Sequence, residues 1–95
     1  MTPRISVIVL NYNGRQWLEP CLSALAAQAD APAFETLLVD NGSSDDSVPF
    51  VTERFPSVRI LRNGGNLGFA AGNNAGARAA RGDTLVFLNN DTIPA

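Results

Sequence analysis

The sequence contains no histidine and no lysine, and its only cysteine is Cys21. These absences exclude a histidine general base, a lysine Schiff base and a phosphate-binding P-loop lysine. They also remove most of the ligands from which transition-metal sites are built. Because Cys21 cannot form an internal disulfide, the composition fits a reducing compartment.

Long hydrophobic runs and a strong charge imbalance are missing as well. No apolar stretch approaches the ~20 residues of a membrane-spanning helix. The net charge is −2 with a pI near 4.8, so we expect neither a nucleic-acid partner nor an anionic membrane surface. The opening "MTPRISVIVLNYNG" has a short β-branched run and no small-residue cleavage site. It is therefore not expected to be a signal peptide, and we expect a cytoplasmic protein.

Apolar runs and helical patterns alternate along the 95 residues, which suffice for one domain. The apolar runs predict strands over residues 5–10, 34–40, 58–62 and 84–88. Helices are predicted in "RQWLEPCLSALAAQ", "VPFVTERF" and "FAAGNNAGARAARG". The first should begin near residues 15–17, since proline is tolerated only close to a helix start, and the last should be capped by Gly82. We place Trp17 and Cys21 on the buried side of the first helix.

This β-α-β-α-β-α-β order predicts the fold class α/β. We expect a Rossmann-like parallel sheet of about four strands, with right-handed crossovers and helices on both faces.

Polar and glycine residues follow every predicted strand. The four loops are residues 11–14, 40–43, 63–68 and 89–92. Each alone is typical of a turn, because Asn, Asp, Gly and Ser favour turns. Since ligands of parallel α/β sheets bind beyond the carboxyl ends of the strands, four such loops on one edge favour a binding site.

The loops offer neutral hydrogen-bonding groups and few cations, which suits ribose and a base edge. The phosphate charge would then be met by backbone amides or by a metal, and Mg²⁺ needs only one or two protein carboxylates. Asn11 and Tyr12 directly follow the first strand; the Tyr12 ring could stack on a base or simply cover the core at the rim. The P-loop GxxxxGK is absent, and "GGNLGF" lacks the GxGxxG order of dinucleotide folds.

Gly68, Gly72 and Gly76 recur every four residues, followed by Ala80. On a helix they share one nearly bare face. We assign Gly76 and Ala80 to packing on the sheet, and the Gly68 end to a ligand.

Together, "ISVIVLNYNG", "LLVDNGSSDDS", "NGGNLGFAAGNNAG" and "GDTLVFLNNDTIP" resemble the family 2 glycosyltransferases, inverting enzymes of the GT-A fold. The resemblance covers nearly the whole chain. It is strongest to bacterial cell-surface polysaccharide transferases, including rhamnosyltransferase-like members.

The resemblance implies a role for individual positions. Tyr12 matches the residue that packs on the donor's base, and Asp40 with Asn41 matches an acidic pair that helps to read the base. The second member of that pair is an amide here, which leaves the preferred base open. Asn66 and Gly68 match the turn after the third strand.

Further along the chain, Asn74 matches a recurring asparagine, while Asn73 stands where relatives often have arginine. Asn89, Asn90 and Asp91 match the Asp-x-Asp motif. Asn89 replaces its first acid, Asn90 falls where ribose is commonly held, and Asp91 keeps the position that binds Mg²⁺ or Mn²⁺.

The implied donor is a nucleotide-diphosphate sugar linked to UDP, dTDP or GDP. The implied reaction is hexosyl or rhamnosyl transfer with inversion to a saccharide or lipid-linked acceptor. The catalytic base is expected beyond residue 95, so residues 1–95 are interpreted as a nucleotide-sugar-binding part that is inactive alone. The full-length enzyme would work in the cytoplasm or at the inner face of the plasma membrane.

Two other functions are weighed. One is a nucleotide-binding or regulatory module without catalysis. The other is a sugar-nucleotidyltransferase, but residues 11–15 offer only one Gly and one Arg where that class has a glycine-rich basic loop. An uncovered sheet edge at the last strand also predicts self-association, for example as a homodimer.

Overall fold

Strands and helices alternate strictly in the computed structural model, which describes residues 4–28 and 34–90. The strands are β1 (Ile5–Asn11), β2 (Phe34–Asp40), β3 (Arg59–Arg62) and β4 (Thr84–Asn89). The helices are α1 (Arg15–Ala26), α2 (Ser47–Arg54) and α3 (Phe69–Ala79). The predicted elements are confirmed, with most boundaries shifted by no more than one residue.

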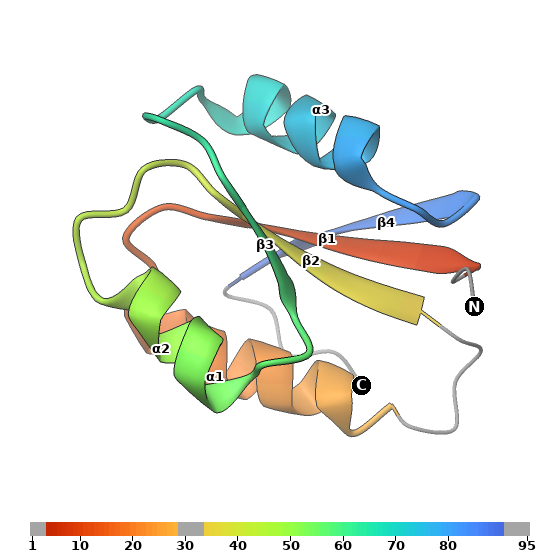
Figure 1. Cartoon of the computed structure of the whole chain (residues 1–95), viewed down its shortest axis with the longest axis horizontal. Helices are drawn as coiled ribbons and strands as arrows, with labels where there is room; N and C mark the ends of the chain where they lie inside the picture. Colours follow the sequence, from red (N-terminus) through yellow and green to blue (C-terminus); the bar gives the residue numbers. More distant parts are fainter. Residues whose placement is uncertain (1–3, 29–33, 91–95) are drawn as a thin grey trace.

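All four strands are parallel, in the order β3-β2-β1-β4. Ile5 of β1 pairs with Phe34 of β2 on one side and with Thr84 of β4 on the other. Figure 1 shows α1 and α2 on one face of this sheet and α3 on the other. The predicted parallel α/β sheet with helices on both faces is therefore confirmed.

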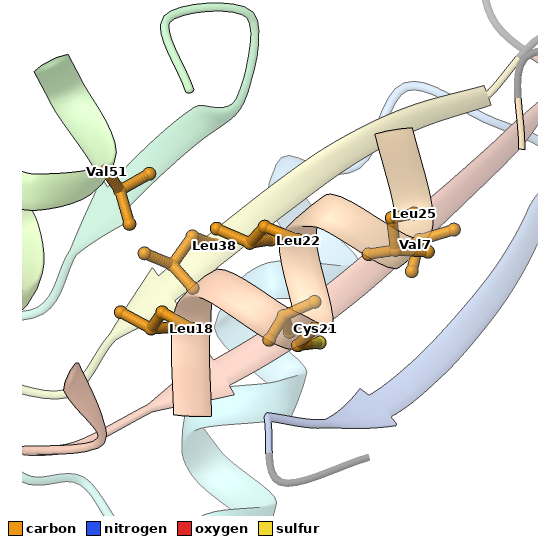
Figure 2. Close-up of a cluster of buried hydrophobic side chains, with 8 residues drawn as sticks. Val7, Leu18, Cys21, Leu22, Leu25, Leu38 and Val51 are labelled. Atoms are coloured by element: carbon orange, nitrogen blue, oxygen red, sulfur yellow. The ribbon is translucent and has the colours of Figure 1, made fainter. Parts of the chain in front are cut away.

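The face beneath α1 and α2 holds the larger core. Its apolar stripe on α1 follows helical spacing, which lets one side of the helix meet the sheet. Figure 2 shows these side chains converging with those of β1, β2 and α2. The buried members are Val7, Val9, Leu18, Cys21, Leu22, Leu25, Leu38 and Val51.

The other face is covered by α3 at very short range. A Cβ on Gly76 would lie 2.7 Å from Ile8 Cγ2 and 2.8 Å from Val39 Cγ2. A Cβ on Gly72 would lie 2.6 Å from Leu10 Cδ1. The prediction that Gly76 serves packing is confirmed, because any side chain there would push α3 away from the sheet.

The predicted start of α1 near residues 15–17 is confirmed at Arg15, and Pro20 lies inside the helix. Two other local predictions about the helices need correction. Trp17 is 46% exposed, since it flanks the stripe formed by the buried side chains of α1, whereas Cys21 is buried as predicted. The helix α3 ends at Ala79, so Gly82 is no cap; a Cβ there would meet the backbone of β1, 2.7 Å from Ser6 N.

A search of the described residues finds no helix with the length and apolar character needed to cross a membrane.

Candidate functional site

The carboxyl edge of the sheet is where the chain changes direction. From β1 it runs through α1 to β2 and β3 on one side, and then returns through α3 to β4 on the other side. The switch point is therefore the gap between the carboxyl ends of β1 and β4. In open parallel sheets this is the place where ligands bind.

Asp40, at the end of β2, is a buried carboxylate that the neighbouring loops surround with donors. It is only 2% exposed. Its Oδ1 accepts hydrogen bonds from Asn11 Nδ2 at 3.0 Å and from Ser43 Oγ at 2.6 Å, and its Oδ2 accepts one from the Ser43 backbone N at 2.9 Å. A buried carboxylate is tolerable because it is bonded in this way.

Asn11 extends this network from β2 across β1 to β4. It is fully buried, and its Oδ1 accepts a hydrogen bond from Asn90 Nδ2 at 2.7 Å. Gly14 leaves the space for this contact: a Cβ there would lie 2.2 Å from Asn90 Nδ2 and 2.6 Å from Asn11 Oδ1. The two strand ends at the switch point are thus joined through side chains.

The first and second loops are also tied together. Asn13 adopts a positive φ of 51°, and its Oδ1 accepts hydrogen bonds from the backbone N–H groups of Ser44 at 2.7 Å and Asp45 at 3.2 Å. Burial alone would raise the pKa of the Asp45 carboxyl, but hydrogen bonds from Ser47 and Arg15, with the charge of Arg15, lower this pKa below its usual range. These contacts fix the start of α2 against the start of α1.

Asn41 holds the third loop. It is 2% exposed, and its Oδ1 accepts a hydrogen bond from Asn63 Nδ2 at 2.7 Å. Its Nδ2 donates to Gly68 O at 3.2 Å and to Asn66 Oδ1 at 3.4 Å. Asn66 Oδ1 in turn accepts the Gly68 backbone N–H at 2.9 Å. The side chain that the sequence places beside a base therefore sits beneath the loop and supports it.

Other predicted site residues lie open to solvent. The Tyr12 side chain is 50% exposed, and Asn74 and Asn89 are exposed. Gly68 has a φ of +83°, and no atom lies within 4 Å of the position of a Cβ there. Tyr12 and the Gly68 turn are thus accessible to a ligand at the carboxyl edge.

The predicted metal ligand, Asp91, lies outside the described residues. Within residues 4–28 and 34–90, no three His, Cys, Asp or Glu side chains gather so as to hold a metal ion. The carboxylate of Asp40, at the end of β2, accepts hydrogen bonds from Asn11 and Ser43.

Sequence reasoning included four further residues in the loops of this edge but gave none of them an individual role: Asn13, Gly14, Ser43 and Asn63. The three-residue spacing from Asp40 to Ser43 is a sequence signal of a side-chain-stabilised turn and could have marked Ser43. Nothing local marks Gly14, because its neighbour Asn90 is distant in sequence.

The chain was compared with protein families and with known proteins. The model of the family described as "Glycosyl transferase family 2" matches residues 6–95. A Haemophilus influenzae protein, "Uncharacterized glycosyltransferase", is 37% identical over 87 residues, covering 92% of this chain and 29% of the relative. A Mycobacterium tuberculosis "N-acetylglucosaminyl-diphospho-decaprenol L-rhamnosyltransferase" is 36% identical over 69 residues, covering 73% and 22%.

Solved structures of two glycosyltransferases are also similar to this chain. Staphylococcus aureus TarS in complex with UDP-GlcNAc has a TM-score of 0.84 at 28% identity, covering 93% of this chain and 26% of that one. The Pyrobaculum calidifontis mannosyltransferase PcManGT, in complex with GDP-Man and Mn²⁺, has a TM-score of 0.85 at 29% identity, covering 100% and 30%. The chain thus spans less than a third of the length of each of these four proteins.

Proposed function

Because the chain belongs to glycosyl transferase family 2, we propose that residues 1–95 form the part of a GT-A glycosyltransferase that binds a nucleotide-diphosphate sugar. The observation that carries this proposal is the switch point, where Asp40, Asn11 and Asn90 are joined across three strands. Support comes from the two related structures, which hold UDP-GlcNAc and GDP-Man respectively.

The proposed donor site runs along the carboxyl edge. Tyr12, half exposed directly after the buried Asn11, would pack on the base. Asn90 would face the ribose, and the exposed Asn89 would lie beside it at the first position of the Asp-x-Asp motif. The Gly68 turn and Asn74, at the start and middle of α3, would approach the remainder of the donor. The buried Asn41 would act from beneath the turn, and the exposed Asn66 from within the loop, by holding that turn.

A divalent cation, Mg²⁺ or Mn²⁺, is proposed at Asp91. The neutral character of the edge supports it, because a diphosphate brought to this surface meets few cationic side chains. When bound, such a cation would neutralise charge on the leaving diphosphate. The PcManGT structure with Mn²⁺ supports a divalent metal in this class of site.

Titration of the chain with UDP, dTDP and GDP, with and without Mn²⁺ or Mg²⁺, tests the proposal. We expect at least one nucleotide to bind, with affinity raised about tenfold by the metal, or ~1.4 kcal/mol. In Asp91→Ala, the increase in nucleotide affinity caused by the metal should vanish, while the affinity measured without metal should stay the same. Isothermal titration calorimetry measures both.

Asp83→Ala is the matched control, because Asp83 is an exposed carboxylate that precedes β4 at the opposite edge. It should bind as the wild type does. Metal enhancement that survives in Asp91→Ala would refute the metal assignment, and absence of binding by every nucleotide would refute the donor site.

For the full-length enzyme we propose hexosyl or rhamnosyl transfer with inversion at the anomeric carbon. The acceptor, a saccharide or a lipid-linked saccharide, would lose its hydroxyl proton to a base outside residues 1–95. It would form the new bond as the nucleoside diphosphate leaves. Residues 1–95 alone should show no turnover, and the cytoplasm or the inner face of the plasma membrane is the proposed location.

We also propose self-association through β4. Among the strands that the structure describes, β4 pairs only with β1, and its residues Leu85, Val86 and Phe87 are 37%, 41% and 49% exposed. An exposed apolar edge strand can pair with a second copy. Analytical ultracentrifugation should show a dimer that weakens in Val86→Lys, because charge on an edge strand opposes pairing. A strict monomer at high concentration would refute this.

A further inference from the structure

The carboxylate of Asp40 and the amide of Asn90 lie on either side of Asn11 and contact it, but do not hydrogen-bond to each other. We propose that Asn11 is a positioning residue that sets the orientation of the Asn90 amide, so that Asn90 offers its carbonyl oxygen to a hydroxyl of the bound ribose. This inference rests on the proposed function only for the identity of the ligand.

The orientation follows from hydrogen-bond polarity. Both oxygens of Asp40 accept hydrogen bonds in the structure, and Asn11 turns its Nδ2 toward Oδ1, at 3.0 Å. The Oδ1 of Asn11 then faces Asn90, which can meet it only with Nδ2, at 2.7 Å. This leaves Asn90 Oδ1 on the branch of the amide that faces away from Asn11, with no hydrogen-bond partner among the described residues.

Burial makes Asn11 a support for the site instead of a ligand contact. Asn11 is 0% exposed, and Nδ2 also donates to Ser43 Oγ at 3.2 Å, so both ends of its amide are engaged. Asn90, in contrast, is only partly buried and can reach a ligand. A flipped Asn11 would set its Oδ1 against the Asp40 Oδ1 that now accepts from Nδ2, which disfavours the alternative.

Gly14 gives this arrangement its room. The Cβ of an alanine at this position would lie within 3.3 Å of two Asn90 side-chain atoms, Nδ2 and Cγ, and 2.6 Å from Asn11 Oδ1. We call the hydrogen-bonded series Asp40–Asn11–Asn90 the relay. Gly14→Ala removes no polar group, so it perturbs the relay without deleting a ligand contact. This makes it the informative variant.

Nuclear magnetic resonance tests the relay without any ligand. In the ¹⁵N-labelled chain, the side-chain NH₂ of Asn90 should exchange slowly with D₂O and should shift in both Gly14→Ala and Asp40→Asn. Gly82→Ala is the control, because it introduces a Cβ 2.7 Å from backbone atoms at the opposite edge. An Asn90 NH₂ that exchanges at the rate of exposed amides, or is unmoved by Gly14→Ala, overturns the proposal.

Binding of ribose variants tests the consequence. Wild-type chain should bind UDP or GDP about tenfold more tightly than the same nucleotide lacking its 2′ or its 3′ hydroxyl. Gly14→Ala and Asn90→Ala should each reduce this preference to about twofold, and Gly82→Ala should keep it. In the Asn90→Ala background, Gly14→Ala should cost no further preference.

The role of the relay is overturned if Gly14→Ala keeps the preference for nucleotides with both ribose hydroxyls. It is also overturned if Gly82→Ala reduces that preference as much as Gly14→Ala does. If no nucleotide binds the wild type, the proposed function fails, and the Asn90 NH₂ measurement still decides whether Asn11 positions Asn90.

Discussion

Replacement of Asn41 by aspartate should lower the free energy of unfolding by about 3 kcal/mol at pH 7. The side chain is 2% exposed, and its Nδ2 faces two groups that can only accept: the Gly68 carbonyl oxygen and Asn66 Oδ1. The Oδ1 of Asn66 also accepts the Gly68 backbone N–H, at 2.9 Å, which is the contact expected of the oxygen of this amide. A carboxylate at this position would face two oxygens without a proton between them.

Chemical denaturation between pH 4 and pH 8 measures this effect. The introduced carboxyl should have a pKa raised in the folded state, so its cost should be largest above that pKa and shrink as the pH falls, since the protonated form can donate. Asn74→Asp, on the exposed face of α3, should change stability by less than about 0.5 kcal/mol. A stable Asn41→Asp chain with the same pH dependence as wild type would contradict the assigned hydrogen bonds.

Replacement of Glu35 by glutamine should cost about 2 kcal/mol at pH 7, because this carboxylate closes the amino edge of the sheet. Its Oε2 accepts from Ser6 Oγ at 2.6 Å and from the Arg81 backbone N at 2.7 Å, while Oε1 pairs with Arg59. One side chain on β2 thus binds β1, β3 and the connection between α3 and β4. A glutamine would turn an N–H toward one of these donors.

The pH dependence of this variant has a definite sign. Burial alone would raise the pKa of Glu35, but hydrogen bonds from Ser6, Arg81 and Arg59, with the charge of Arg59, lower it below the usual 4.5. A lowered folded-state pKa means that the stabilisation is present above pH ~4.5 and is lost as the pH falls through the folded pKa. The stability gap between wild type and Glu35→Gln should therefore narrow below pH 4.5.

Glu19→Gln supplies the matched control for this measurement. Glu19 pairs with Arg54 at 3.4 Å, but the two side chains are 50% and 59% exposed. Exposed pairs contribute ~0–1 kcal/mol, so this variant should stay near wild type. If Glu19→Gln and Glu35→Gln lower the free energy of unfolding equally, the special role of Glu35 is contradicted.

The hydrogen bonds of Asn41 also explain a departure from the family pattern. The resemblance implies an acidic pair at positions 40 and 41, yet position 41 is an amide. Here the second position must donate to Gly68 O, which an ionised acid cannot do. The replacement therefore keeps the third loop in place.

Much of the fold could be predicted from local sequence. The β-branched run from Ile5, the apolar spacing of α1 and the glycine spacing of α3 each specify an element, because side-chain periodicity reports which face is buried. The predictions failed where long-range packing decides. Gly82 resembled a cap but lies against β1, and Trp17 lies beside the buried stripe of α1.

The sequence by itself determined the alternation of strands and helices and the polar residues at every strand end, since periodicity and turn chemistry are local properties. Only the tertiary structure decided which of those residues meet. The strand order sets β4 beside β1 and brings Asn90 to Asn11 across 79 positions of sequence. The tertiary structure also decided that Asn11 and Asn41 are buried residues that support the loops, because burial and hydrogen-bond polarity depend on neighbours that no local pattern specifies.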